Sequence, residues 1–106
     1  MTVQEKYLKK YFDKRLEDCL GVIKEYNLDY QEVGIFGSYA RGDYNTNSDV
    51  DLCMITNNRP VRSVSGELRE RLDLLGAELM YITPATFSES DKPIYTNIRR
   101  DYVRLL

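Results

Sequence analysis

Apolar side chains recur at helical spacing along the N-terminal part of the chain, with charged residues between them. Thr2 and Glu5, three residues apart, have the form of a capping box, which marks the start of a helix. The pattern predicts one long helix from this box to near Asn27. Its buried stripe consists of Leu8, Phe12, Leu16, Cys19, Leu20 and Ile23.

A short, mostly apolar run follows at residues 32–36 and stops at Gly37. Such a run is typical of a buried strand that meets a tight turn at its carboxyl end. Residues 38–41 could then open a brief helix, and residues 42–47 are a polar loop.

The next segment, residues 49–55, alternates between two kinds of side chain. Side chains alternate across a strand with period two, so its odd and even positions should lie on opposite faces of a sheet. One face should carry Val50, Leu52 and Met54, and the other Asp49, Asp51 and Cys53.

The second half of the chain continues the alternation of helix and strand. An apolar stripe predicts a helix over residues 64–75, and Gly76 is placed to end it. A strand should follow at 77–82, a last helix should begin at Pro93, and residues 102–106 could form a closing strand.

Thr83 and Pro84 break the strand at 77–82, and no further element is expected before Pro93. The resulting order is α-β-α-β-α-β-α-β with short connections. This order predicts an α/β (α+β) fold in which a mixed β-sheet is flanked by helices. We expect residues 1–106 to form a single domain.

The amino-acid composition limits which catalytic residues and metal ligands the chain can use. The chain has no histidine, which excludes Ser-His triads and histidine-ligated metals, so catalysis would rest on carboxylates and metal ions. Cys19 and Cys53 are far apart and predict neither a disulfide framework nor a zinc site. There is no secretory signal and no apolar run long enough to span a membrane, so we expect a cytoplasmic protein.

The balance of 15 basic and 17 acidic side chains argues against a protein that neutralises many phosphates of a long nucleic acid. A mononucleotide remains a suitable ligand. The residues around Gly37 fit this ligand, because a glycine at a strand end lets backbone N–H groups approach a phosphate. Ser38 can add a hydroxyl donor, and Arg41 is the nearest fixed cation for a phosphate oxygen.

Ten residues after Gly37-Ser38, Asp49 and Asp51 should project from one strand face. Two such carboxylates can jointly hold one or two hard cations, with Mg²⁺ (or Mn²⁺) the natural choice. Taken alone, an Asp-x-Asp pair is more often a solvated turn or strand end. Ser48 either contacts the substrate or caps the turn before the strand.

Gly37-Ser38, the ten-residue gap and Asp49-Val50-Asp51 together resemble the signature of the DNA polymerase β superfamily of nucleotidyltransferases. The fuller string, with Ala40-Arg41-Gly42 and Ser48, is similar to its minimal nucleotidyltransferase branch. The resemblance covers nearly the whole chain.

Members of this branch are commonly antitoxins paired with a HEPN-domain ribonuclease toxin. The resemblance therefore implies Mg²⁺-dependent transfer of AMP from the substrate ATP to a tyrosine of a HEPN toxin. It also implies that Gly37, Ser38, Arg41 and Ser48 bind the nucleotide, while Asp49 and Asp51 bind the metal.

The resemblance implies a third carboxylate on the following strand, and here the chain departs from the family pattern. Aligning Thr83-Pro84 with the family's threonine and proline puts Met80 at the acidic position. Glu78 lies two residues earlier and shares a strand face with Met80, so the longer glutamate could reach the metal from one step back. Glu78 is therefore our candidate for the third ligand.

Two alternatives to this function remain. The chain could be a non-catalytic antitoxin that blocks its toxin by binding, which Met80 at the acidic position would explain. It could instead transfer a nucleotide to a small molecule or an RNA end. The short length leaves little room for an acceptor-binding domain, and the charge balance disfavours RNA.

Overall fold

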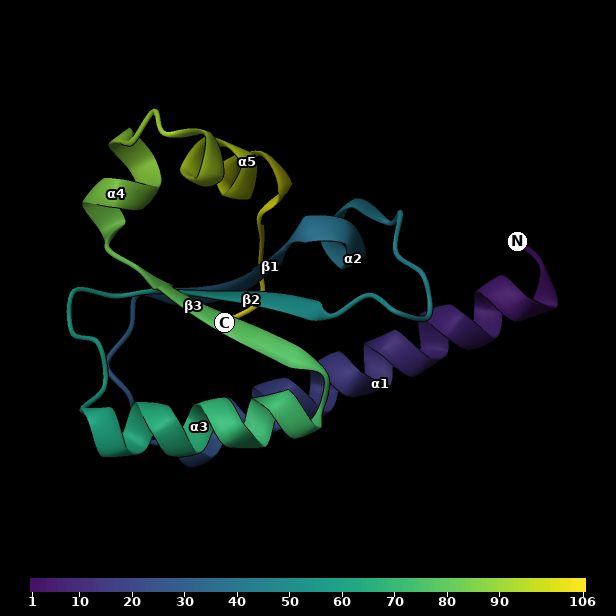
Figure 1. The fold of residues 1–106 in the computed structure, drawn as a ribbon, viewed down its shortest axis with the longest axis horizontal. Helices are drawn as coiled ribbons and strands as arrows, with labels where there is room; N and C mark the ends of the chain where they lie inside the picture. The colour runs from purple at the N-terminus through teal and green to yellow at the C-terminus, as the bar shows by residue number, and fades with distance from the viewer.

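The computed structural model describes residues 1–106 and contains five helices and four strands (Figure 1). The predicted elements are all present, and one helix is additional. In chain order the elements are α1 (Val3–Glu25), β1 (Glu32–Phe36), α2 (Gly37–Arg41), β2 (Val50–Ile55), α3 (Arg62–Leu74), β3 (Ala77–Ile82), α4 (Pro84–Glu89), α5 (Pro93–Asp101) and β4 (Val103–Arg104).

The strands form one mixed sheet in the order β3-β2-β1-β4. β1 pairs antiparallel with both β2 and β4, whereas β2 and β3 are parallel and connected through α3. The prediction of a mixed sheet flanked by helices is confirmed. This order makes β3 one outer edge of the sheet and leaves β2 in its interior.

The helices cover the two faces of the sheet in separate groups. Figure 1 shows α1 and α3 on one face and α2, α4 and α5 on the other. The alternation of β2 sends Val50, Leu52 and Met54 into the larger core cluster, which includes residues of α1 and α3. Cys53 and Ile55 enter a smaller cluster with Ile98 of α5. Each face of β2 is therefore buried by a different helical layer.

The ends of the helices follow local sequence signals. The Thr2 hydroxyl accepts a hydrogen bond from the Glu5 backbone N–H at 3.0 Å, as the capping box predicts. Gly76, just after α3, has φ 72°, a left-handed conformation that glycine adopts without strain. That turn reverses the chain directly into β3.

The structure corrects the expectation that no element lies between Thr83 and Pro93. Thr83 caps α4 by accepting a hydrogen bond from the Thr86 backbone N–H at 3.2 Å, and Pro84 occupies its first turn. The pair that ends β3 is therefore also a helix start, because proline suits the first turn of a helix. No helix of the structure has the length and apolar character needed to cross a membrane.

Candidate functional site

The centre of the candidate site is the contact between Gly37 and Asp51. Asp51 on β2 lies opposite Phe36, the last residue of β1, and Gly37 follows immediately at φ 76°. A Cβ atom at position 37 would come within 2.4 Å of the Asp51 carboxylate oxygen Oδ2. The glycine is needed here both for its backbone conformation and for its lack of a side chain.

Glu78 lies beside Asp51 on the neighbouring strand. In the parallel register of β2 and β3, Asp51 pairs with Glu78, while Cys53 pairs with Met80. Glu78 is exposed, and Met80 packs at the margin of the smaller core cluster. The register therefore puts Glu78 level with Asp51, closer than the position one step back that we expected from the alignment.

Asp49 comes just before β2 starts at Val50, and its side chain is exposed. Burial raises the pKa of the half-buried Asp51 carboxyl, and the negative charges of Glu78 and Asp49 raise this pKa further. Arg41 opposes the shift. Asp49 and Glu78 are thus both close enough to Asp51 to act on its carboxylate electrostatically.

The burial of Asp51, together with the repulsion from Glu78 and Asp49, predicts how the stability of the protein depends on pH in metal-free buffer. Because the folded state raises the pKa of Asp51, the free energy of unfolding should fall as pH rises from the ordinary aspartate pKa to the raised one. Asp51→Asn removes this pH-dependent loss. At pH values above the raised pKa of Asp51, the variant should therefore have a higher free energy of unfolding than the wild type, by about 1 kcal/mol or less because the group is half-exposed. Thermal unfolding of both proteins between about pH 4 and about pH 7 tests this. A mutant less stable than the wild type at neutral pH would contradict it.

The donor set of the site suits a hard divalent cation, since all three candidate ligands are carboxylates. Their side chains do not converge on one point: no three acidic, cysteine or histidine side chains of the chain form a cluster that could hold a metal ion. Asp49 and Glu78 are exposed, so both can change rotamer without disturbing the core. Asp51 is held by its strand and by the close approach of Gly37. The chemistry of these three carboxylates fits a divalent metal ion, and the two exposed ones would have to reorient to ligate it together with Asp51.

Ser38 occupies the first turn of α2, beside Gly37. No side chain caps this helix, so its first-turn N–H groups are not satisfied by a capping residue. The carboxyl end of α2 is closed by backbone hydrogen bonds: the Ser38 carbonyl accepts from the N–H groups of Gly42 and Asp43. The amino end of α2 is therefore available next to the Asp51 carboxylate.

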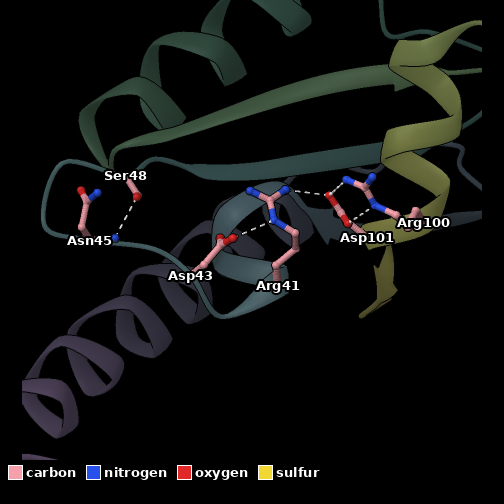
Figure 2. Close-up of polar contacts among 6 residues, drawn as sticks. All are labelled: Arg41, Asp43, Asn45, Ser48, Arg100 and Asp101. Atoms are coloured by element: carbon pink, nitrogen blue, oxygen red, sulfur yellow. Dashed lines mark hydrogen bonds and ion pairs between the residues drawn. The ribbon is translucent and has the colours of Figure 1, made fainter.

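Arg41, at the end of α2, is held by two acidic partners. Figure 2 shows its guanidinium between Asp43, at 3.1 Å, and Asp101 of α5, at 2.8 Å. The side chain of Asp101 is only 5% exposed. Hydrogen bonds from Arg100 and then Arg41 hold the pKa of Asp101 below its usual range, so it stays ionised. Arg41 is close enough to lower the pKa of Asp51, but its guanidinium is engaged by α5.

Ser48 caps the turn before β2. Its hydroxyl accepts a hydrogen bond from the Asn45 backbone N–H at 2.9 Å (Figure 2). Its carbonyl accepts a second one from Arg15 of α1. The structure shows Ser48 as a turn cap, and its hydroxyl forms no hydrogen bond with the other candidate residues.

A cavity of about 640 Å³ opens beside the carboxylates. It begins at Asp51 and Glu78 and continues around the β3 edge of the sheet to α3. Cavities of this size accommodate small-molecule ligands and peptide side chains. The sequence indicates Asp51 and Glu78 as site residues but neither this cavity nor Asp101. Asp101 is 60 residues from Arg41, and the cavity is formed between elements that meet only in the fold.

The chain matches the family profile of the nucleotidyltransferase domain over residues 6–102. One similar solved structure is a crystal structure of a toxin-antitoxin with AMP-PNP, with a TM-score of 0.53 and 19% identity, covering 92% of this chain and 72% of that one. Another is that of a candidate nucleotidyltransferase from Sulfolobus solfataricus, with a TM-score of 0.45 and 19% identity, covering 94% and 80%. No curated protein sequence matches the chain. At this identity the first structure shows a common fold.

Proposed function

The chain belongs to the nucleotidyltransferase domain family, as a minimal nucleotidyltransferase, and we propose that it is an antitoxin that transfers AMP from ATP to a tyrosine of a HEPN ribonuclease toxin. The observation that carries this proposal is the placement of Asp51 between Gly37 and Glu78. A phosphate approaching the bare backbone at Gly37 would lie beside a carboxylate pair suited to hold its metal ion.

Each residue of the site has a distinct role in this proposal. Gly37 and the amino end of α2 receive the triphosphate, with the Ser38 hydroxyl as an added donor. Asp49, Asp51 and Glu78 would hold Mg²⁺, which when bound neutralises phosphate charge and lowers the pKa of an attacking hydroxyl. Arg41 faces the same region and would contact a phosphate oxygen by leaving one of its two acidic partners. Ser48 shapes the loop that leads into Asp49.

The partner is proposed from two sources. The minimal nucleotidyltransferase branch commonly pairs with HEPN toxins, and the similar structure described as a toxin-antitoxin contains the ATP analogue AMP-PNP. We further propose that residues 1–106 act as a single domain in the cytoplasm.

Glu78→Gln tests the catalytic part of this proposal. Glu78 would orient the ion that contacts the incoming hydroxyl, so its loss should slow transfer about 10- to 100-fold. ATP affinity should change little, because Asp49 and Asp51 still hold the ion that accompanies the triphosphate. A fall in kcat with nearly constant ATP affinity is the expected signature. Single-turnover transfer to the toxin and ATP titration by calorimetry measure the two quantities, and an unchanged rate would remove Glu78 from the site.

A second candidate function is neutralisation of the toxin by binding alone. The observation that favours it is that the three carboxylates do not converge in this structure. In that case the wild-type protein would inhibit the toxin without adding AMP to it.

A further inference from the structure

β3 is an edge strand with one side of its backbone unpaired. The carbonyls of Gly76 and Ile82 accept hydrogen bonds from Val50 and Thr56, which places both on the side of β2. Backbone groups alternate sides along a strand, so those of Ala77, Leu79 and Tyr81 point away from β2. β3 has no neighbour on that side, which Figure 1 shows as the outer edge above α3.

One face of α3 runs along this open edge and forms the other wall of the cavity. The cavity-lining residues of α3 follow helical spacing: Arg62, Ser65, Gly66, Arg69, Leu72 and Asp73. The small side chains in the middle leave space, since nothing lies within 4 Å of a Cβ built on Gly66. The middle of this α3 face therefore leaves room for a peptide chain to lie against β3.

Three arginines that line the cavity have no acidic partner. None of the ion pairs of the chain includes Arg59, Arg62 or Arg69. In contrast, Arg71, which does not line the cavity, pairs with Glu25. The Arg59 guanidinium lies over the Tyr81 ring, 4.9 Å from its centroid. The arginine side chains can therefore receive acidic groups without breaking an existing ion pair.

The charges of the cavity are separated along β3. α3 precedes β3 and runs antiparallel to it, so the start of α3 lies at the carboxyl end of β3. Arg59 and Arg62 are therefore at the carboxyl end of the strand, and Arg69 lies about 10 Å further along α3. Asp51 and Glu78 lie at the amino end of β3. An extended chain lying on the edge would thus span from the arginines to the carboxylates.

We propose that the β3 edge and the facing side of α3 bind an extended, acidic segment of the acceptor protein as an added strand. Its acidic residues lie against Arg59, Arg62 and Arg69, and its hydroxyl-bearing residue reaches Asp51 and Glu78. Unpaired strand N–H and C=O groups match a peptide backbone, which is why a peptide fits this edge better than a nucleic acid strand does. The acceptor role rests on the proposed function, whereas the docking itself does not.

The docking is measured without catalysis, by fluorescence anisotropy of a fluorescein-labelled octapeptide of alternating glutamate and valine. This glutamate-valine peptide should bind the wild type more tightly than a control octapeptide of alternating lysine and valine. Arg62→Glu with Arg69→Glu should weaken binding about tenfold, because two attractions become repulsions. Lys6→Glu with Lys10→Glu makes the same change in net charge on α1, away from the cavity, and should leave binding nearly unchanged.

Leu79→Pro tests the backbone contact, because proline removes an N–H on the open side of β3 and is tolerated at a strand edge. It should weaken peptide binding several-fold relative to Leu79→Ala, which loses the same packing. Equal binding by these two variants, or equal binding of the two peptides, would overturn the proposal. So would an oligouridylate that competes with the peptide and is insensitive to Leu79→Pro, or a wild-type dimer that the double arginine variant dissociates. Intact peptide binding in a protein that transfers no AMP would remove the proposed function and leave the docking site.

Discussion

Asp49→Asn combined with Asp51→Asn is expected to reduce AMP transfer by about a thousandfold or more, because a metal that loses both ligands no longer contributes several kcal/mol of transition-state stabilisation. The two carboxylates lie at the start of β2, and Asp51 is fixed by its register with Phe36 and Glu78. Transfer is measured as incorporation of labelled AMP into the toxin.

The same double variant provides a binding control. ATP with magnesium should raise the Tm of the wild type, because a ligand that binds only the folded state stabilises it. The shift should be absent in the double variant. A shift of equal size in both proteins would place the nucleotide and metal elsewhere.

Gly37→Val is expected to abolish transfer while most of the helical circular dichroism remains. The new Cβ would lie 2.4 Å from Asp51 Oδ2 and would fill the space proposed for the phosphate. The positive φ of Gly37 adds strain on the order of 1–3 kcal/mol for a branched residue.

Gly42→Val separates these two effects. Gly42 also has positive φ, 86°, but nothing lies within 4 Å of its Cβ position. This variant should lose stability with less loss of activity, since it carries the strain without the contact to Asp51. If a folded Gly37→Val protein retains transfer, or if both variants lose it equally, the phosphate site at Gly37 is misassigned.

The elements of this fold are readable from the sequence because its local signals are strong and agree with one another. The bounds of β1 and β3 match the predicted runs, and the glycine at position 76 ends the helix as expected. α4 was missed because Thr83 and Pro84 carry two meanings, the end of a strand and the start of a helix. Period-two alternation also predicts that Asp51 lies on the sheet face opposite Val50, in agreement with the two core clusters that the β2 side chains enter, whereas Asp49 precedes the strand.

The remaining features of the site depend on contacts between distant segments. The level position of Glu78 beside Asp51 follows from the register of two parallel strands, which no local pattern specifies. The engagement of Arg41 by Asp101 joins α2 to α5 across 60 residues. The open β3 edge follows from the strand order of the whole sheet. Local periodicity carries no information on these three relations.

The mass of the proposed HEPN toxin partner after incubation with this protein, ATP and magnesium distinguishes AMP transfer from neutralisation by binding alone. Intact-protein mass spectrometry should show the toxin heavier by one or more AMP units with the wild type and unchanged with the Asp49→Asn, Asp51→Asn double variant. Toxin activity should fall together with the modification. A toxin that is neutralised by the wild type while its mass stays unchanged would contradict the account and identify a binding antitoxin.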